Sequence, residues 1–258
     1  MQLIVTRPIA QALPWVAALQ ALGHAAQALP LIDIAPPLDQ APVRAAWQTL
    51  ARKSLVMFVS ANAVEHFFQA RPAGQVWPRG VLAGSTGPGT SAALRSAGVS
   101  AEDLVQPAPD APRLDSEALW AQLQGRDWSA CQALIVRGEE GRDWLADTLR
   151  ARGAQVAFVA AYRRRMPRLD ARQQALLAAA QAAPADHLWL FSSSEAVANL
   201  RALHPHADWT ASQAVASHPR IAQAAHEAGF GKVAVLAPTP QAVAHWVAGC
   251  PPLQSAPQ

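Results

Sequence analysis

The chain contains one pattern twice, and this internal repeat constrains its fold more than any other feature. Four pairs of segments correspond in the same order: 3–8 with 134–139, 58–67 with 191–200, 79–99 with 211–230, and Pro107 and Pro109 with Pro238 and Pro240. The spacing is 131 residues from Leu3 to Leu134 and 133 residues from Phe58 to Phe191. Four blocks at nearly one spacing predict a duplicated unit of about 130 residues, which is an ordinary domain size.

Each copy is predicted to alternate short strands with amphipathic helices. Apolar residues at helical spacing lead to Gly23 in the first copy and to Gly153 in the second, and each glycine predicts a helix end. A further strand is expected after each glycine, around 29–35 and around 155–162. This alternation predicts an α/β fold in which parallel sheets are covered by helices.

Polar turns follow the predicted strands, at the ends where ligands of parallel sheets bind. Ser60 or Ala61 in the first copy, and Ser193 or Ser194 in the second, occupy the positions of helix N-caps. Helix N-termini present free backbone N–H groups and favour anions. We therefore expect an anion site in a cleft between two such sheets. The candidate binding residues are Arg7, Ser60, Ala61, Asn62, Ser85, Thr90, Ser91, Arg137, Gly138, Ser192, Ser193, Ser194 and Ser217.

The charge balance narrows the choice of partner. The 21 Lys and Arg barely exceed the 18 Asp and Glu, so the net charge of +3 is diffuse and argues against a nucleic-acid partner. One compact basic cluster stands out, formed by Arg163, Arg164, Arg165, Arg168 and Arg172. It indicates either a solvated face or a site for an anionic small molecule, because Arg binds carboxylates with two hydrogen bonds.

Other motifs exclude several kinds of site. GSTGPGTSAAL at 84–94 lacks the lysine of a nucleotide-hydrolysing phosphate loop, which leaves a tight strand-to-helix turn or an anion-facing turn. The histidines and cysteines have no metal-ligand spacing, so no metal is expected. The apolar runs are short and are broken by Arg, Asp, Pro and Gln, so no membrane-spanning helix is expected. No targeting segment precedes LIVTRP, and we expect a cytoplasmic protein.

Two aromatic features remain open to more than one interpretation. Tyr162 is the only tyrosine, and it closes an apolar strand just before the arginine cluster. It is either a packing aromatic at a strand end or a phenol that donates a proton or hydrogen bond into a cleft. Five tryptophans fall within amphipathic helices and are predicted to be core or helix-packing residues: Trp15, Trp47, Trp120, Trp144 and Trp246.

Nine segments, in order along the chain, carry a wider resemblance: VTRP (5–8), LPLIDIAP (29–36), FVSANAV (58–64), GPGTSAAL (87–94), LIVRGEEGRDWLADTLRARGA (134–154), AYRR (161–164), FSSSEAV (191–197), SHPRIAQAAHEAGF (217–230) and PTPQAV (238–243). No single segment is specific, but the ordered set resembles the uroporphyrinogen-III synthase family. The resemblance covers nearly the whole chain.

The resemblance implies a domain arrangement that the repeat alone does not. It implies two similar domains, each a parallel sheet flanked by helices in a flavodoxin-like fold, joined by a two-stranded connector. The first domain would be discontinuous and would comprise residues 1–36 and 166–258, while residues 37–165 would form the second. Hinge closure of the two domains is then expected.

The resemblance also implies a reaction. Members of this family are cofactor-free enzymes of tetrapyrrole (heme) biosynthesis. They dehydrate and cyclise hydroxymethylbilane, or preuroporphyrinogen, and invert the last pyrrole ring D. The substrate carries eight carboxylates, which fits the polar turns. Tyr162 matches the tyrosine of the family's connector and is the expected catalytic residue, assisting loss of the hydroxyl group. A cytoplasmic, monomeric hydro-lyase acting on a small molecule is therefore expected.

Two alternatives predict different outcomes in simple experiments. A non-catalytic two-domain binder or sensor of an anionic small molecule would bind the substrate without converting it. A nucleic-acid-binding protein would show salt-sensitive affinity for DNA, and the diffuse charge argues against it.

Overall fold

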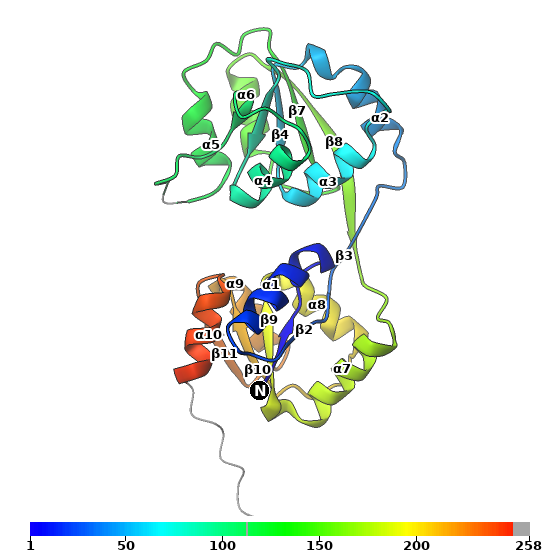
Figure 1. Cartoon of the computed structure of the whole chain (residues 1–258), viewed down its shortest axis with the longest axis vertical. Helices are drawn as coiled ribbons and strands as arrows, with labels where there is room; N and C mark the ends of the chain where they lie inside the picture. Colours follow the sequence, from blue (N-terminus) through cyan, green and yellow to red (C-terminus); the bar gives the residue numbers. More distant parts are fainter. Residues whose placement is uncertain (112, 250–258) are drawn as a thin grey trace, which may run out of the picture. The chain divides into compact units, whose positions relative to one another are not determined.

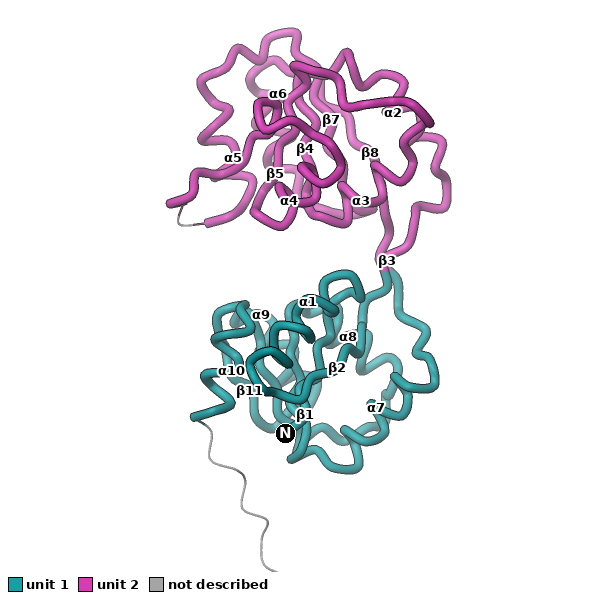
Figure 2. The backbone as a smooth tube through the Cα atoms, viewed as in Figure 1, with its two compact units in different colours: residues 1–33, 165–258 teal, residues 34–164 magenta. Residues whose placement is uncertain are grey.

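The computed structural model describes residues 1–111 and 113–249. Backbone contacts divide the chain into two compact units (Figure 2): unit 1 contains Met1–Asp33 and the chain from Arg165 onward, and unit 2 contains Ile34–Arg164. In each unit the strands lie in the middle, with helices on both sides (Figure 1). In the described part of the chain, no helix is both long and apolar enough to cross a membrane.

The elements of unit 1 come from both ends of the chain. Its strands and helices are β1 (Gln2–Val5), α1 (Ile9–Ala21), β2 (Ala26–Ala28), α7 (Ala171–Ala182), β9 (His187–Phe191), α8 (Ser194–Leu203), β10 (Gln213–Ala216), α9 (Pro219–Glu227), β11 (Lys232–Val235) and α10 (Pro240–Gly249), with a 3₁₀ turn η2 (Pro184–Asp186). Within the described residues its sheet has five parallel strands, in the order β2-β1-β9-β10-β11.

Unit 2 is built from the middle of the chain. Its elements are α2 (Ala41–Gln48), a 3₁₀ turn η1 (Leu50–Arg52), β4 (Leu55–Phe58), α3 (Ala61–Gln69), β5 (Leu82–Ser85), α4 (Pro88–Ser96), β6 (Leu104–Val105), α5 (Ser116–Leu123), β7 (Gln132–Gly138), α6 (Trp144–Ala151) and β8 (Gln155–Arg165). The sheet order is β3-β8-β7-β4-β5-β6, where β3 (Asp33–Ala35) and β8 both cross the boundary between the units. The predicted α/β architecture of two parallel sheets flanked by helices is confirmed.

The strand expected around 29–35 is wrong as a single element. The structure has β2 at Ala26–Ala28 in the sheet of unit 1 and β3 at Asp33–Ala35 in the sheet of unit 2. Pro30 lies between them and has no N–H group to donate, so a regular ladder cannot continue through it. One apolar run therefore supplies strands to two sheets.

The predicted helix boundaries agree with the backbone geometry. Gly23 and Gly153 follow α1 and α6 with φ values of +85° and +91°, a region that favours glycine and ends each helix. Of the two N-cap choices in each copy, the caps are Ser60 and Ser193. Ser60 Oγ accepts from the Ala63 N–H, and Ser193 Oγ accepts from the Glu195 N–H.

Strand alternation in unit 2 divides its core between the two faces of the sheet. Along β4, Val56 and Phe58 point into a cluster with residues of α2, α3 and α4, whereas Leu55 and Met57 point into a cluster with residues of α5 and α6. All four side chains are buried. A strand that is apolar at every position is typical of a parallel sheet covered on both faces.

Candidate active site

Each sheet has one position where ligands of open α/β sheets bind. In unit 1 the strand order reverses between β1 and β9, and in unit 2 it reverses between β7 and β4. At such a switch point the loops after the two neighbouring strands diverge to opposite faces and leave a crevice at their carboxyl ends. Most of the predicted binding residues lie in or next to these two places.

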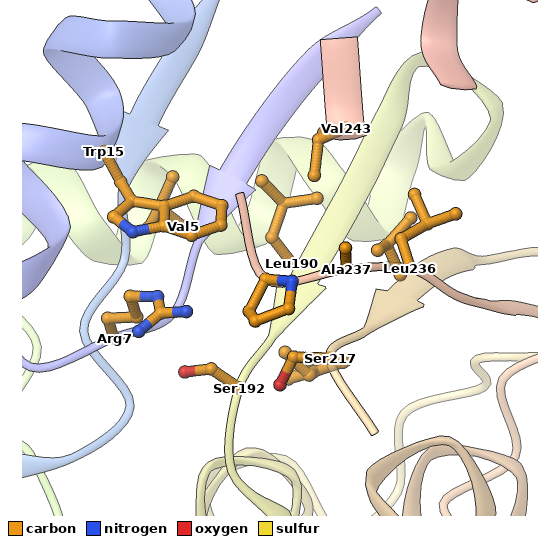
Figure 3. Close-up of a pocket in the computed structure, with 12 residues that line it drawn as sticks. Val5, Arg7, Trp15, Leu190, Ser192, Ser217, Leu236, Ala237 and Val243 are labelled. Carbon is orange, nitrogen blue, oxygen red and sulfur yellow. The ribbon is translucent and has the colours of Figure 1, made fainter. Parts of the chain in front are cut away.

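The switch point of unit 1 contains a pocket (Figure 3). Its walls come from the ends of β1, β9, β10 and β11 and from α1 and α10: Val5, Arg7, Trp15, Leu190, Phe191, Ser192, Val215, Ser217, Leu236, Ala237, Pro238 and Val243. The empty space, which includes the open mouth, is about 300 Å³. The pocket unites three predicted residues that are far apart in sequence, namely Arg7, Ser192 and Ser217.

Arg7 supplies the charge of this pocket. Its guanidinium carbon lies 4.4 Å from the centre of the Trp15 ring, a cation–π contact. Burial lowers the pKa of the Arg7 side chain from its ordinary value, yet a guanidinium remains charged in proteins. No acidic side chain among residues 1–111 and 113–249 forms an ion pair with it. The pocket thus holds an uncompensated, half-buried positive charge.

The four predicted serines of unit 1 have different surroundings. The hydroxyl groups of Ser192 and Ser217 face the pocket with Arg7 (Figure 3). Ser193 caps α8, so its oxygen is already used. Ser194 Oγ is buried and has no hydrogen-bond partner within the described residues. Ser192 and Ser217 are therefore the hydroxyl groups best placed to meet a ligand in this pocket.

In unit 2 the switch point brings together Ser60, Gly138 and Tyr162. Ser60 Oγ donates a hydrogen bond of 3.3 Å to the phenol oxygen of Tyr162. A methyl group added at Gly138 would lie 3.2 Å from Cε2 and Cζ of the Tyr162 ring, so the phenol lies directly over this glycine. Because its oxygen accepts from Ser60, the phenol keeps its own proton for donation to another group.

A bulge explains how Tyr162 reaches this position. The register of β7 and β8 pairs Arg137 with Ala160 and then Gly138 with Tyr162, so one residue of β8 is skipped. Regular alternation would place Tyr162 on the same face as Phe158, against α6. The bulge instead turns its ring into the cluster on the opposite face, where only 3% of the residue is exposed.

His66 lies beside Tyr162 and was not among the predicted site residues. Its ring, on α3, stacks near the phenol with centroids 6.2 Å apart. Burial lowers the pKa of His66 from its ordinary value, and the neighbouring Glu65 carboxylate opposes this effect in part. The imidazole is therefore held in its neutral form more than an exposed histidine is.

Arg137 lies at the end of β7 but differs from Arg7 in its partners. It stacks on Phe158 at 4.2 Å, forms an ion pair with Asp143 and donates to the Gly141 carbonyl. Its charge is thus compensated within unit 2.

The remaining predicted residues of unit 2 lie at the starts of α3 and α4, except Ser85, which ends β5. The hydroxyl groups of Ser85 and Ser91 are fully buried and lie 2.6 Å apart, so they hydrogen bond to each other. Asn62 and Thr90 are also buried. The cap of α4 is Gly87, which offers no side-chain acceptor, and Ala61 is the first residue of α3. Backbone N–H groups of these helix starts are what this edge offers an anion.

The arginine cluster joins the two connector strands. Arg163 Nε donates to the Pro36 carbonyl at 3.2 Å, and Arg165 Nε bonds a carboxylate oxygen of Asp33 at 2.6 Å. At these two positions the structure supports neither a purely solvated face nor an open anion site. Both side chains hold the segment of β3 against β8.

Two residues beside the site were not predicted from the sequence. Trp15 was predicted only as a core or helix-packing residue, and His66 was given no role. Their periodicity is that of ordinary amphipathic helices, and only the contacts with Arg7 and Tyr162 distinguish them. Among the other helix tryptophans, Trp47 and Trp120 are buried as predicted, whereas Trp144 is 37% exposed. The described residues contain no group of three or more His, Cys, Asp and Glu side chains that could hold a metal ion.

Comparisons with known proteins agree on one family. A family model described as uroporphyrinogen-III synthase HemD matches residues 14–245. Uroporphyrinogen-III synthase of Salmonella typhimurium is 32% identical over 177 residues, which cover 68% of this chain and 70% of that protein. The Escherichia coli enzyme is 30% identical over 177 residues, with the same coverage of 68% and 70%.

Two solved structures resemble the whole fold. A mutant uroporphyrinogen III synthase of Thermus thermophilus is 17% identical, with a TM-score of 0.55 and coverage of 96% of this chain and 98% of that one. Uroporphyrinogen-III synthetase of Helicobacter pylori is 15% identical, with the same TM-score of 0.55 and the same coverage. At these identities the likeness concerns the fold.

Proposed function

The chain belongs to the uroporphyrinogen-III synthase family, and from this membership we infer that it converts hydroxymethylbilane to uroporphyrinogen III, with loss of water and inversion of ring D. The observation that carries this conclusion is the match to the family model over residues 14–245, which includes elements of both units. The reaction belongs to heme biosynthesis.

We propose that Tyr162 acts as the acid that assists departure of the substrate hydroxyl group. The electron-rich pyrrole expels this group, the C–O bond breaks, and the phenol proton leaves with it as water. A weak acid suffices, because the ring stabilises the resulting cation. The hydrogen bond from Ser60 supports this role, since it stabilises the negative charge that develops on the phenol oxygen.

Inversion of ring D depends on how the protein orients the bound substrate. The terminal ring attacks through its substituted carbon and gives a spiro intermediate, so the protein must favour this geometry over direct closure. We propose that the substrate's carboxylates are bound at the polar edges of both units. Arg7, Ser192 and Ser217 in unit 1, and the starts of α3 and α4 in unit 2, support this assignment.

We also propose that the enzyme acts as a cytoplasmic monomer, with no nucleic acid or membrane as a partner. The near balance of 21 basic and 18 acidic residues supports the absence of a nucleic-acid partner. Size-exclusion chromatography with light scattering tests the oligomeric state: a mass near 27.3 kDa is expected, and a concentration-independent doubling contradicts the monomer.

The decisive experiment is an assay on freshly prepared hydroxymethylbilane, with separation of the uroporphyrinogen isomers. The proposal expects isomer III in excess over the spontaneous, uninverted isomer I. Isomer I alone at micromolar enzyme would refute it. Tight binding of the substrate without conversion would instead favour the non-catalytic binder.

Tyr162→Phe tests the proposed acid. The variant removes one hydroxyl and keeps the buried ring, so the fold is expected to persist while kcat falls about tenfold or more. Circular dichroism and urea denaturation provide the check on folding. A near-wild-type kcat would remove Tyr162 from catalysis.

A further inference from the structure

We propose that the pocket around Arg7 is a subsite for a single carboxylate group, and that Trp15 is the positioning residue that holds Arg7 for it. The identity of the ligand as one substituent of the tetrapyrrole rests on the proposed function. The existence, charge and size of the pocket are independent of the proposed function.

The charge of the pocket favours an anion. A half-buried cation without a partner is costly, and within the described residues Arg7 has no ion pair. Arg137 in unit 2 also stacks on an aromatic ring, but Asp143 neutralises it. Of these two arginines, only Arg7 lacks an ion pair within the described residues.

The size and the lining of the pocket select a carboxylate. About 20 Å³ is open to the centre of a water molecule, and one water needs about 10–15 Å³. The inner space is therefore small, and a flat carboxylate fits it more readily than a bulkier tetrahedral phosphate or sulfate. Val5, Leu190 and Val243 form apolar walls that suit the methylene groups next to a carboxyl group.

The hydrogen-bond donors converge on this space. Ser192 and Ser217 carry hydroxyl groups that make no hydrogen bond with other described residues, and both face the pocket (Figure 3). The guanidinium of Arg7 adds a planar pair of N–H donors that matches a carboxylate. The pocket therefore offers donors and, in these three side chains, no charged acceptor.

Trp15 determines where the guanidinium lies. Its indole covers one face of Arg7 at 4.4 Å, which restricts the flexible side chain and leaves the N–H edge free for a ligand (Figure 3). Trp15 belongs to α1 and packs partly against the core of unit 1, so the ring is itself held in place. Without the indole, the Arg7 side chain would adopt more conformations, and its N–H groups would point into the pocket less often.

The first experiment measures binding directly, on the full chain. Titration with sodium propionate, followed through the backbone ¹⁵N–¹H signals of Ser192 and Ser217 by NMR, is expected to give a saturable shift that Arg7→Met abolishes. Inorganic phosphate and methanesulfonate at the same concentration are expected to give none. No shift with propionate, or an equal response to phosphate, would overturn the proposal.

The second experiment tests the role of Trp15. Trp15→Leu is expected to weaken propionate binding about threefold and to raise KM for hydroxymethylbilane more than it lowers kcat, whereas Trp15→Phe, which keeps an aromatic face, restores most of both. Trp144→Leu is the control, because Trp144 is also a helix tryptophan, belongs to unit 2 and is 37% exposed. Equal effects of Trp15→Leu and Trp15→Phe, or no effect of either, would exclude the positioning role.

The two proposals fail in different ways. If wild-type protein binds propionate at Arg7 but forms no isomer III, the proposed function is wrong and the pocket remains. If isomer III forms but Arg7→Met leaves KM and propionate binding unchanged, the proposed carboxylate subsite is wrong and the proposed function stands.

Discussion

The phenol of Tyr162 is confined by three neighbours within unit 2. Ser60 bonds its oxygen, Gly138 lies beneath its ring, and His66 stacks beside it. Two of the three belong to α3, at its N-cap and in its middle, and the third ends β7. The position of one reactive group thus depends on single atoms of residues that have no reactive role of their own.

Gly138→Ala is expected to displace Tyr162. The added methyl group would approach the ring to 3.2 Å, closer than most side-chain contacts, so the phenol must shift or the strands must separate. We expect a stability loss of about 1–3 kcal/mol and a fall in kcat larger than the fall in folded protein. Gly125→Ala, where a methyl group meets nothing within 4 Å, is the control. Unchanged kcat in Gly138→Ala would show that the close contact does not matter for catalysis.

His66 is expected to make stability depend on pH. Because burial lowers the pKa of His66 in the folded state, the unfolded chain binds a proton more readily below the ordinary value of 6.5. Stability therefore falls as the pH drops through about 6.5 and below. His66→Gln removes this contribution and is expected to flatten the curve of unfolding free energy between about pH 7 and pH 5. The exposed His226→Gln is the comparison, and identical slopes for all three proteins would contradict the assignment.

At the scale of elements, strand β8 combines two tasks. It pairs with β7 inside unit 2, and it continues across the boundary to Arg165 in unit 1. The bulge opposite Gly138 lies between the part of β8 that pairs with β7 and the part that crosses the boundary. It changes which face of the sheet the following side chains occupy. The arginines beyond it bond to β3 and to the Pro36 carbonyl, so the connector is fixed by polar contacts where apolar burial is slight.

Helix α7 follows the connector and begins with a capping box. Asp170 accepts from the Gln173 N–H, and the Gln173 side chain accepts from the Asp170 N–H. Asp170→Ala is expected to cost about 1 kcal/mol, within the range of about 0.5–2 for N-caps. The measurement is urea denaturation, with Arg172→Ala in the same first turn as the control. If the free energies of unfolding of the two variants agree within experimental error, the cap does not contribute to stability.

At the scale of the whole molecule, the two repeat copies and the two compact units do not coincide. Numbered along the chain, the sheet of unit 1 has the order 2-1-3-4-5, which is common among doubly wound folds. The sheet of unit 2 has the same arrangement when β3 is left out and β7 and β8 are counted before β4, β5 and β6. In unit 1 the first two strands, β1 and β2, come from the first copy and the last three from the second. In unit 2 the reverse holds, with β7 and β8 supplied by the second copy.

Because unit 2 is continuous and has cores on both faces of its sheet, residues 34–164 are expected to fold alone. The isolated segment should show a cooperative urea transition and near-native circular dichroism. It should lack synthase activity, since the Arg7 pocket belongs to unit 1. The Leu134→Ala form of the same segment, which opens a cavity beneath β7, is the control and should lose about 2–5 kcal/mol. A non-cooperative transition in the unmodified segment would contradict an independent unit.

The amino-acid sequence by itself determined the repeat, the parallel α/β sheets, the glycines that end the helices and the serines that cap them, because these follow from local periodicity and backbone preference. It also placed Arg7, Ser192 and Ser217 in polar turns, since strand ends are local features. Only the tertiary structure decided that these three share one pocket with Trp15, that residues 29–35 serve two sheets, and that a bulge turns Tyr162 toward Ser60. Those outcomes depend on strand order, register and long-range packing, which no local pattern encodes.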